Sequence, residues 1–301
     1  MKFRFDQYLV LILLAFIFLL PVKKADTATS FLPEIELTEI NPIPVLNPTQ
    51  QPELFMASIS AQSVVVIDVD SAAILLEKKS HQKVAPASTT KLMTALVARD
   101  NLSLDQLISV KKKPLGIGHT IGFKLGESFL AADIFKGLLI NSGNDAAEVL
   151  AQNHPQGRAA FIEEMNAKAQ ALHLRESNFI NPSGLDAAAH YTSAFDLSLI
   201  SRQLMKDSFL KSLVGTQQAQ ITDQTGLNQY LFYNTNLLLS TEPGVVGIKT
   251  GTTDLAGEAL ITQVQRDQHQ VMFVVLGSEN RYADTKKIID WVFSNYQWLT
   301  I

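Results

Sequence analysis

Three short segments, far apart in the chain, carry residue types that could together perform acyl transfer. The first contains Ser88 and Lys91, three residues apart at the predicted opening of a helix. Side chains at this spacing share one helix face, so the Lys91 amine could take the proton of the Ser88 hydroxyl. A lysine serves as a base only when neutral, and burial beside another cation such as Lys249 lowers its pKa in that direction. Taken alone, the pair also fits a capping serine followed by an ordinary surface lysine.

The second segment, residues 139–146, combines an apolar run with a hydroxyl, a glycine and a carboxamide. Ser142 could relay a proton, and Asn144 could orient a substrate amide because its side chain offers both a donor and an acceptor. The alternative is a plain helix start, since serine and asparagine are good N-cap residues.

The third segment, residues 246–252, lies on a predicted strand. Lys249 and Thr250 could present hydrogen-bond donors to an anionic group. Gly251 could let a substrate backbone approach and pair with the strand edge. The alternative is a strand that simply ends in a glycine turn.

The composition of the chain excludes several other kinds of site. The 301 residues are 47% hydrophobic, which is enough to bury a large core. The net charge of −4 gives no indication of nucleic-acid binding. With no cysteine, a hydroxyl must supply any covalent chemistry. The sequence has neither an H-E-x-x-H pair nor a G-x-G-x-x-G fingerprint, so we infer no metal and no cofactor. We expect His190 to be a structural hydrogen-bonding residue.

The elements that must position these segments include both strands and helices. Two apolar runs at 64–69 and 72–76 predict a β-hairpin, and the pattern from 87 to about 174 is helical. The later predictions are adjacent antiparallel strands at 245–249, 259–264 and 271–276, then a closing helix with Ile288, Trp291, Val292 and Tyr296 on one face. We therefore expect an α/β (α+β) fold: an antiparallel sheet flanked by helices, with a mainly helical subdomain and the site at their junction.

The N-terminal part predicts export. Two basic residues precede an unbroken apolar stretch from Tyr8 to Leu20, which is the arrangement of a secretory signal. We expect residues 1–28 to be a signal peptide or an N-terminal membrane anchor. Residues 29–55 are rich in proline and predict an extended linker. The catalytic domain is expected at 56–301.

Together, the three segments match the signature of penicillin-binding proteins and class A β-lactamases. The sequence around them resembles the low-molecular-mass D-alanyl-D-alanine carboxypeptidases, peptidase family S11, over nearly the whole predicted domain. The S-G-N form of the second segment also points to this family. The further segments that carry the resemblance are 181–186, 190–194, 234–236 and 276–278, with Arg281. The resemblance implies a β-lactamase/transpeptidase-like fold.

The resemblance assigns catalytic roles to four residues. It implies that Ser88 attacks the D-alanyl-D-alanine carbonyl with Lys91 as base, expelling the terminal D-alanine, and that water then hydrolyses the acyl-enzyme. Ser142 and Asn144 would help proton transfer and substrate placement. The substrate would be a peptidoglycan stem peptide, and β-lactams would be covalent inhibitors.

The resemblance also implies how the substrate is held. Lys249 and Thr250 would face the terminal carboxylate, and Arg281, aligned by its position, would share that role. Gly251 would allow the close approach of the peptide. The backbone N–H groups of Ser88 and Thr252 would hold the oxyanion.

Other activities compatible with the sequence are a D,D-endopeptidase that cuts cross-links and a non-catalytic penicillin-binding sensor. A β-lactamase is less favoured because no convincing deacylating glutamate motif is found. Many members of the family carry a further small β-domain and an amphipathic C-terminal helix. This sequence ends at Ile301, soon after the predicted closing helix, so we expect any membrane contact to depend on the N-terminal segment.

Overall fold

A five-stranded antiparallel sheet forms one half of the fold in the computed structural model, which describes residues 42–47, 51–112 and 117–299. The strands lie in the spatial order β3-β2-β10-β9-β8. Their bounds are β2 Ser63–Asp68, β3 Ile74–Lys78, β8 Val245–Thr253, β9 Gly257–Arg266 and β10 His269–Ser278. The predicted hairpin and the three predicted late strands are therefore confirmed, and all neighbouring strands are antiparallel.

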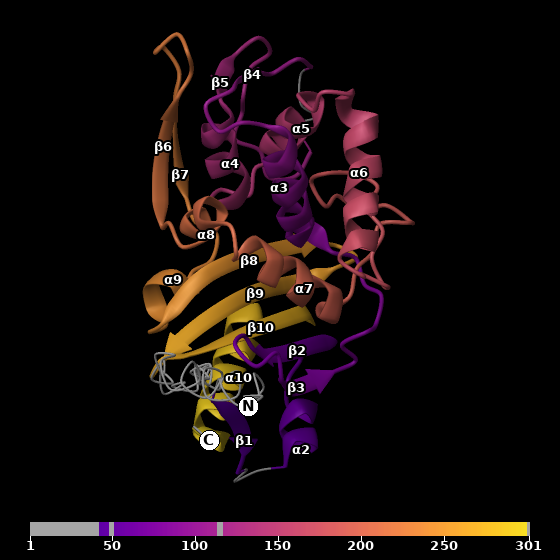
Figure 1. Cartoon of the computed structure of the whole chain (residues 1–301), viewed down its shortest axis with the longest axis vertical. Helices are drawn as coiled ribbons and strands as arrows, with labels where there is room; N and C mark the ends of the chain where they lie inside the picture. Colours follow the sequence, from indigo (N-terminus) through magenta and orange to yellow (C-terminus); the bar gives the residue numbers. More distant parts are fainter. Residues whose placement is uncertain (1–41, 48–50, 113–116, 300–301) are drawn as a thin grey trace, which may run out of the picture. The chain divides into compact units, whose positions relative to one another are not determined.

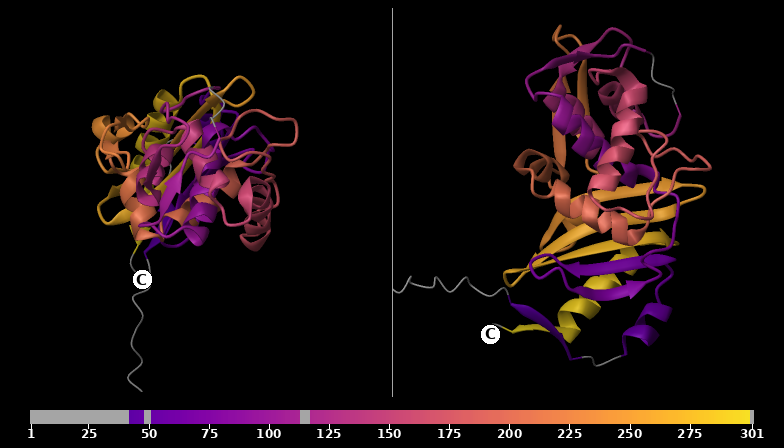
Figure 2. Two further views of the ribbon diagram at one scale, coloured as in Figure 1. Left: turned by 90° about the horizontal axis from the view of Figure 1, so that it is seen from above. Right: turned by 45° about the vertical axis from the view of Figure 1, so that its right-hand side comes forward.

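Alternate residues of the central strands enter two different cores. In β2, Val64 and Val66 pack with one cluster, whereas Val65 and Ile67 pack with the other, as the two-residue period of a strand requires. Both faces of the sheet are covered: α10 (Arg281–Asn295) and α2 (Pro52–Ala57) contribute to the first cluster, and α7 (Ala194–Leu204) to the second. Figures 1 and 2 show α7 and α10 on opposite sides of the sheet.

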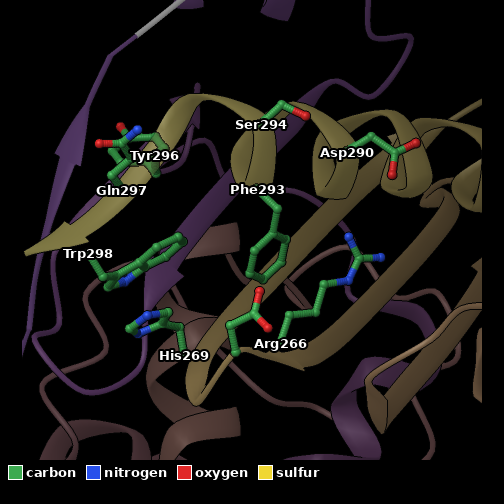
Figure 3. A pocket seen from close by; sticks show the side chains of 9 residues that line it. Arg266, His269, Asp290, Phe293, Ser294, Tyr296, Gln297 and Trp298 are labelled. Atoms are coloured by element: carbon green, nitrogen blue, oxygen red, sulfur yellow. The ribbon is translucent and has the colours of Figure 1, made fainter.

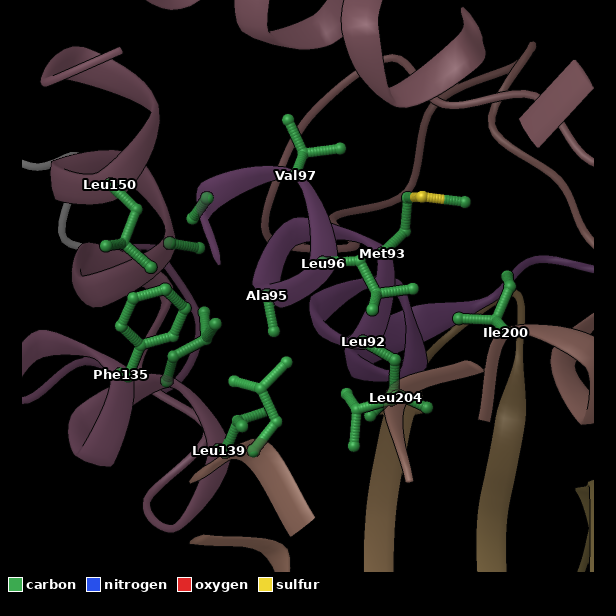
Figure 4. Packing of buried hydrophobic residues seen from close by; sticks show 14 of the residues in the cluster. Leu92, Met93, Ala95, Leu96, Val97, Phe135, Leu139, Leu150, Ile200 and Leu204 are labelled. Atoms are coloured by element: carbon green, nitrogen blue, oxygen red, sulfur yellow. The ribbon is translucent and has the colours of Figure 1, made fainter. Parts of the chain in front are cut away.

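The second half of the fold is helical and surrounds α3. This helix is buried from Thr90 through Ala98, on all sides, as expected for the central helix of a bundle. Figure 4 shows Leu92 and Leu96 of α3 among side chains of the neighbouring helices. The helices of this half are α3 Thr90–Asn101, α4 Ala131–Leu139, α5 Asn144–Gln152, α6 Gly157–Ala171 and α8 Ser208–Val214, and the short α9 Leu238–Thr241 precedes β8. The predicted fold class is confirmed.

Two small hairpins were not predicted. One, β4–β5 (Leu107–Ser109 and Ser128–Leu130), interrupts the span predicted as helical, and the other is β6–β7 (Gln218–Thr222 and Gln229–Tyr233). Strands of three to five residues contain too few alternations to give a periodic signal.

The predicted linker at 29–55 is partly wrong. Within it, β1 (Ile43–Leu46) pairs with β11 (Tyr296–Leu299), and α2 begins at Pro52. The folded part thus starts before residue 56. The prolines of this segment are compatible with both elements. Pro44 lies in β1, and a two-stranded ribbon has only edge strands, in which proline is tolerated. Pro52 lies in the first turn of α2, where the missing N–H would have no partner within the helix. Tyr296, predicted on the closing helix, belongs to β11 instead.

The predicted signal peptide or anchor at 1–28 lies outside the described residues. Within the described ranges, none of the helices combines the length and apolar character that a membrane-crossing segment requires.

Candidate active site

Ser88 and Lys91 are brought together by a tight turn. Ser88 lies in the 3₁₀ turn Ala87–Thr89, which leads directly into α3, and not in the first α-helical turn as predicted. Residues three apart eclipse one another in 3₁₀ geometry, so the predicted contact is still made: Lys91 Nζ lies 2.8 Å from Ser88 Oγ.

The Lys91 amine has two further partners, and both are pure acceptors. Its Nζ lies 2.7 Å from Asn144 Oδ1 and 2.7 Å from the carbonyl oxygen of Ser183. The orientation of the Asn144 amide is consistent, because its Nδ2 donates to the Ile117 carbonyl at 2.9 Å. A neutral amine has two N–H groups and one lone pair. The two acceptors can take both N–H groups, which leaves the lone pair directed at the Ser88 hydroxyl.

The environment of Lys91 favours this neutral form. The side chain is fully buried. Burial holds the pKa of Lys91 well below its usual 10.5, the Lys249 cation lowers it further, and the Asp145 carboxylate acts in the opposite direction.

The turn between α4 and α5 places Ser142 and Asn144. Ser142 has a positive φ of 66°, and Asn144 is the first residue of α5, with its side chain turned to Lys91 instead of capping the helix. The next residue, Asp145, accepts hydrogen bonds from the N–H groups of residues 121–123. Asp145 therefore holds the loop against which Asn144 is anchored, a role that the sequence reasoning missed.

The Ser183 carbonyl is a further site group that the sequence reasoning did not identify. It lies in the segment 181–186, noted only for its resemblance to the family. There Asn181 Oδ1 accepts from the N–H groups of Ser183, Gly184 and Leu185, at 3.2, 2.8 and 3.1 Å. An asparagine turn of this kind was the available signal. It fixes the direction of the Ser183 carbonyl.

Lys249 reaches the same centre from β8. Its Nζ lies 2.7 Å from Ser142 Oγ and 3.1 Å from the Thr250 carbonyl. Burial, aided by the Arg281 cation, lowers the pKa of Lys249 to about 7. The Thr250 hydroxyl is paired with that of Thr235 at 2.6 Å.

Gly251 allows β8 to pack against the turn that carries Ser88. A Cβ atom at this position would lie 3.0 Å from the Ser88 nitrogen and 3.0 Å from the Ala87 Cβ. In Figure 1 the start of α3 meets β8, the last strand of the sheet in the spatial order. The outer edge of β8 therefore faces the catalytic cluster.

Arg281 lies beside the end of β8, where both of its terminal guanidinium nitrogens are engaged by protein groups. One guanidinium nitrogen donates to the carbonyls of Gly251 and Ala259, at 2.8 and 3.1 Å. The other lies 2.5 Å from Thr252 Oγ1 and 3.2 Å from a Glu258 carboxylate oxygen. Arg281 thus stabilises the C-terminal end of β8 through these hydrogen bonds.

A cavity of about 510 Å³ lies at the turn between β9 and β10, away from this cluster (Figure 3). Arg266 and Ala259, the partner of Gly251, are at opposite ends of β9, about 23 Å apart at the rise of a strand. Aromatic rings that line the cavity pack on one another: Trp298 stacks on His269 with ring centroids 4.5 Å apart. This cavity is separate from the catalytic cluster.

Comparison with known proteins identifies the family of the chain that carries this cluster. Residues 47–280, well over half of the chain, match peptidase S11, the family described as D-alanyl-D-alanine carboxypeptidase. The chain belongs to peptidase family S11. All the residues of the cluster fall within this range apart from Arg281, which lies one residue beyond it.

The curated relatives of the chain within the family are carboxypeptidases. It is 32% identical to D-alanyl-D-alanine carboxypeptidase DacF of Bacillus subtilis over 247 residues, which cover 79% of this chain and 63% of DacF. It is 30% identical to DacB2 of Mycobacterium tuberculosis over 243 residues, 78% of this chain and 82% of DacB2. The chain thus spans less than two thirds of DacF.

Solved structures of the family share the fold. The DD-transpeptidase of Streptomyces K15 aligns with a TM-score of 0.75 at 29% identity, over 79% of this chain and 98% of that chain. The carboxypeptidase DacD of Francisella tularensis aligns with a TM-score of 0.73 at 26% identity, over 80% of this chain and 72% of that chain.

Proposed function

We propose that the protein is a serine-type D-alanyl-D-alanine carboxypeptidase that trims peptidoglycan stem peptides through an acyl-enzyme on Ser88. One observation carries the proposal: a fully buried lysine with a strongly lowered pKa lies 2.8 Å from the Ser88 hydroxyl. A hydroxyl with an adjacent neutral base is the arrangement of an activated nucleophile. The carboxypeptidase relatives supply the substrate class.

Acylation follows from this arrangement. Ser88 Oγ attacks the carbonyl carbon of the scissile bond while its proton passes to the Lys91 lone pair. The backbone N–H groups of Ser88 and Thr252 hold the oxyanion. The C–N bond then breaks, and the leaving amine of D-alanine takes up a proton, returned from Lys91 with Ser142 as a relay. Water then attacks the ester carbon while Lys91 takes one of its protons, and Lys91 returns this proton to Ser88 Oγ as the ester bond breaks.

The substrate carboxylate is assigned to the side of Lys249 and Thr250. Protonated Lys249 supplies a buried cation, and Thr250 supplies a hydroxyl whose partner, Thr235, can serve as its donor or acceptor. Arg281 acts here by holding Gly251 and Thr252 in place, and its charge adds to the attraction for the carboxylate.

The predicted location and domain plan form part of the proposal. Residues 1–28 direct export or anchor the chain, so that the domain acts outside the cytoplasm, where its substrate lies. The same N-terminal segment is the proposed point of contact with the membrane. β-Lactams enter the same site and acylate Ser88.

A second outcome of the same acyl-enzyme is transfer to an amine. The alignment over 98% of a chain described as a DD-transpeptidase favours this possibility. A third is endopeptidase cleavage of cross-links. All three share the acylation step and differ in the leaving amine or in the acceptor.

Labelling with a fluorescent penicillin, followed by peptide mass mapping, tests the acylation step. We expect one adduct, on Ser88, that is lost in Ser88→Ala. Release of free D-alanine from an acyl-D-Ala-D-Ala peptide identifies the carboxypeptidase, and assays with an added amine or a cross-linked dimer identify the other two. Labelling of another residue, or no labelling, contradicts the proposal.

A further inference from the structure

A cavity of about 450 Å³ adjoins the catalytic cluster and is not explained by it. Gln62, just before β2, lines one part of it, and three longer segments form the rest of its walls. These segments are residues 82–85, which lead into the Ser88 turn, four residues of the loop after Ser183 (Ala187, Ala188, His190 and Tyr191), and Leu255 and Ala256 in the turn after β8. Each of the three longer segments is continuous with a part of the candidate active site.

The order of groups along β8 gives the direction in which a bound peptide leaves the site. The terminal carboxylate is assigned to Lys249 and Thr250, and the scissile carbonyl to the N–H groups of Ser88 and Thr252. A peptide lying along the outer edge of β8 therefore runs antiparallel to the strand, and its acyl side passes Thr253. Beyond Thr253, the chain passes through Asp254 and reaches the cavity residues Leu255 and Ala256.

The cavity is within reach of the scissile bond. Ala85 in its wall lies three residues before Ser88, and Leu255 lies three residues after Thr252. Three residues span at most about 11 Å. The same length of extended substrate peptide carries its second or third residue on the acyl side of the scissile bond as far as the cavity.

The lining of the cavity suits an anionic group. Lys83 contributes the one side chain charged at neutral pH among the described lining residues, which include neither aspartate nor glutamate. Burial lowers the pKa of His190 to about 4, so this lining residue is neutral. The Lys83 ammonium lies 4.4 Å from the centre of the Tyr191 ring and forms no salt bridge within the described part of the chain.

The carboxylate of the neighbouring loop, Asp186, is held by other groups and is not paired with Lys83. Asp186 Oδ1 accepts from Thr253 Oγ1 at 2.7 Å, and its Oδ2 accepts from the Leu255 N–H at 3.2 Å. These two bonds join the loop after Ser183 to the turn after β8, and so they also fix two walls of the cavity relative to each other.

We propose that this cavity is the subsite for the acyl side of the substrate peptide, and that Lys83 pairs there with a carboxylate two or three residues before the scissile bond. The inference rests on the proposed function, because the peptide direction derives from it. It adds a specificity-determining residue outside the three motifs.

Two synthetic peptides test the proposal. Both end in D-Ala-D-Ala and have the same length, and they differ only in having carboxylates or carboxamides on the second and third residues before the scissile bond. The readout is kcat/KM for D-alanine release by the full chain. We expect the wild type to prefer the carboxylate peptide about three- to tenfold, the range of a solvent-accessible charge pair. Lys83→Ala should abolish the preference through KM, and Lys83→Glu should reverse it.

Lys287→Ala is the matched control, since it removes the same charge from an exposed position on α10 and should keep the preference. Penicillin labelling of Ser88 should be unchanged in every variant. Equal rates for the two peptides in the wild type, or an equal loss for both in Lys83→Ala, overturn the subsite while leaving the proposed function intact. Absence of D-alanine release from either peptide by the wild type overturns the proposed function, and the subsite with it.

Discussion

At the level of single residues, the three partners of Lys91 decide its chemistry. An ammonium could donate to all three, and a neutral amine could donate to Asn144 and Ser183 while accepting from Ser88. Both protonation states therefore keep every hydrogen bond. The amine can gain and lose a proton during each catalytic cycle without rearrangement of its surroundings.

Replacing Asn144 by aspartate tests how the pKa of Lys91 is set. The Asn144→Asp change places a negative charge where Oδ1 now lies, 2.7 Å from Nζ. Because an adjacent carboxylate favours the ammonium, we expect the pKa of Lys91 to rise, and the rising limb of the pH profile for penicillin acylation to move up by about 1–3 pH units. Gln229→Glu adds the same charge on the exposed face of β7 and should leave the profile unchanged. An unshifted limb in Asn144→Asp contradicts Lys91 as the base.

The protonation of Lys249 should determine the falling, high-pH limb of the pH profile. It is required in its protonated form, and its pKa is lowered to about 7. In the free enzyme kcat/KM should therefore decline as the pH rises through about 7, whereas the limb in kcat should lie higher because a bound carboxylate favours the cation. Lys249→Arg keeps its charge at every pH tested and should remove the decline. A decline that persists in this variant would assign that limb to another group.

The sequence predicted side-chain chemistry at these sites better than their pairing. Ser88 and Lys91 were paired by their spacing, and the structure joins them. Ser142 and Asn144 come from one motif, but Ser142 contacts Lys249 whereas Asn144 contacts Lys91. The Ser183 carbonyl could not be predicted, because every residue has such a group and only the fold selects one.

At the level of elements, the site depends on close approach between backbone segments. Gly184 has a φ of +88°, and a Cβ there would lie 1.7 Å from the Ala87 carbonyl oxygen. The loop that presents Ser183 to Lys91 therefore packs directly on the turn that carries Ser88. A side chain at this position must displace one of the two.

Gly184→Ala should both destabilise the protein and impair the site. We expect a loss of more than about 2 kcal/mol in the free energy of unfolding, because backbone strain and a backbone clash act together, and a slower acylation by penicillin. Gly226→Ala is the control: it has a similar φ of +78° but nothing within 4 Å of the added Cβ. Gly226→Ala should lower the free energy of unfolding by only about 1 kcal/mol and leave the rate of acylation unchanged. Equal effects of the two changes would show that the clash is relieved at little cost.

Long, periodic elements were predictable and short paired ones were not. The continuous apolar runs of β2 and β10 indicate strands by themselves. By contrast, β1 and β11 are four residues each and lie at opposite ends of the described chain. Each is stabilised by the other, so no local pattern reveals either. Tyr296 was assigned to the helix for the same reason: its spacing fits α10, but its backbone pairs with Leu46.

At the level of the whole molecule, the sheet and the helical half meet at the catalytic cluster. Lys249 comes from the last strand of the sheet, Lys91 from the central helix, and Ser142 from the turn between two other helices. Each lysine contacts a serine, and the Lys249 charge also contributes to lowering the pKa of Lys91. The catalytic cluster is therefore complete only where the two halves pack together.

His190 makes the stability of the folded protein depend on pH. Its ring bonds Thr90 Oγ1 at 2.9 Å and accepts from the Ile180 N–H at 3.1 Å, which confirms the structural role predicted for it. Burial lowers the pKa of His190 from 6.5 to about 4. The unfolded chain therefore binds a proton that the folded protein does not, between about pH 6.5 and 4, and the free energy of unfolding must fall as the pH is lowered through this range.

The size of this effect can be measured by urea unfolding between pH 7 and 4. A pKa difference of this size corresponds to about 3 kcal/mol lost on acidification. His190→Asn should start from a lower stability at pH 7, because it lacks the same hydrogen bonds, but its stability should decline less steeply with acid. His173→Asn, at an exposed histidine with a positive φ that asparagine tolerates, should keep the wild-type slope. If His190→Asn and the wild type lose stability in parallel, the acid sensitivity belongs to the buried carboxylates and not to the histidine that holds the Ser183 loop against α3.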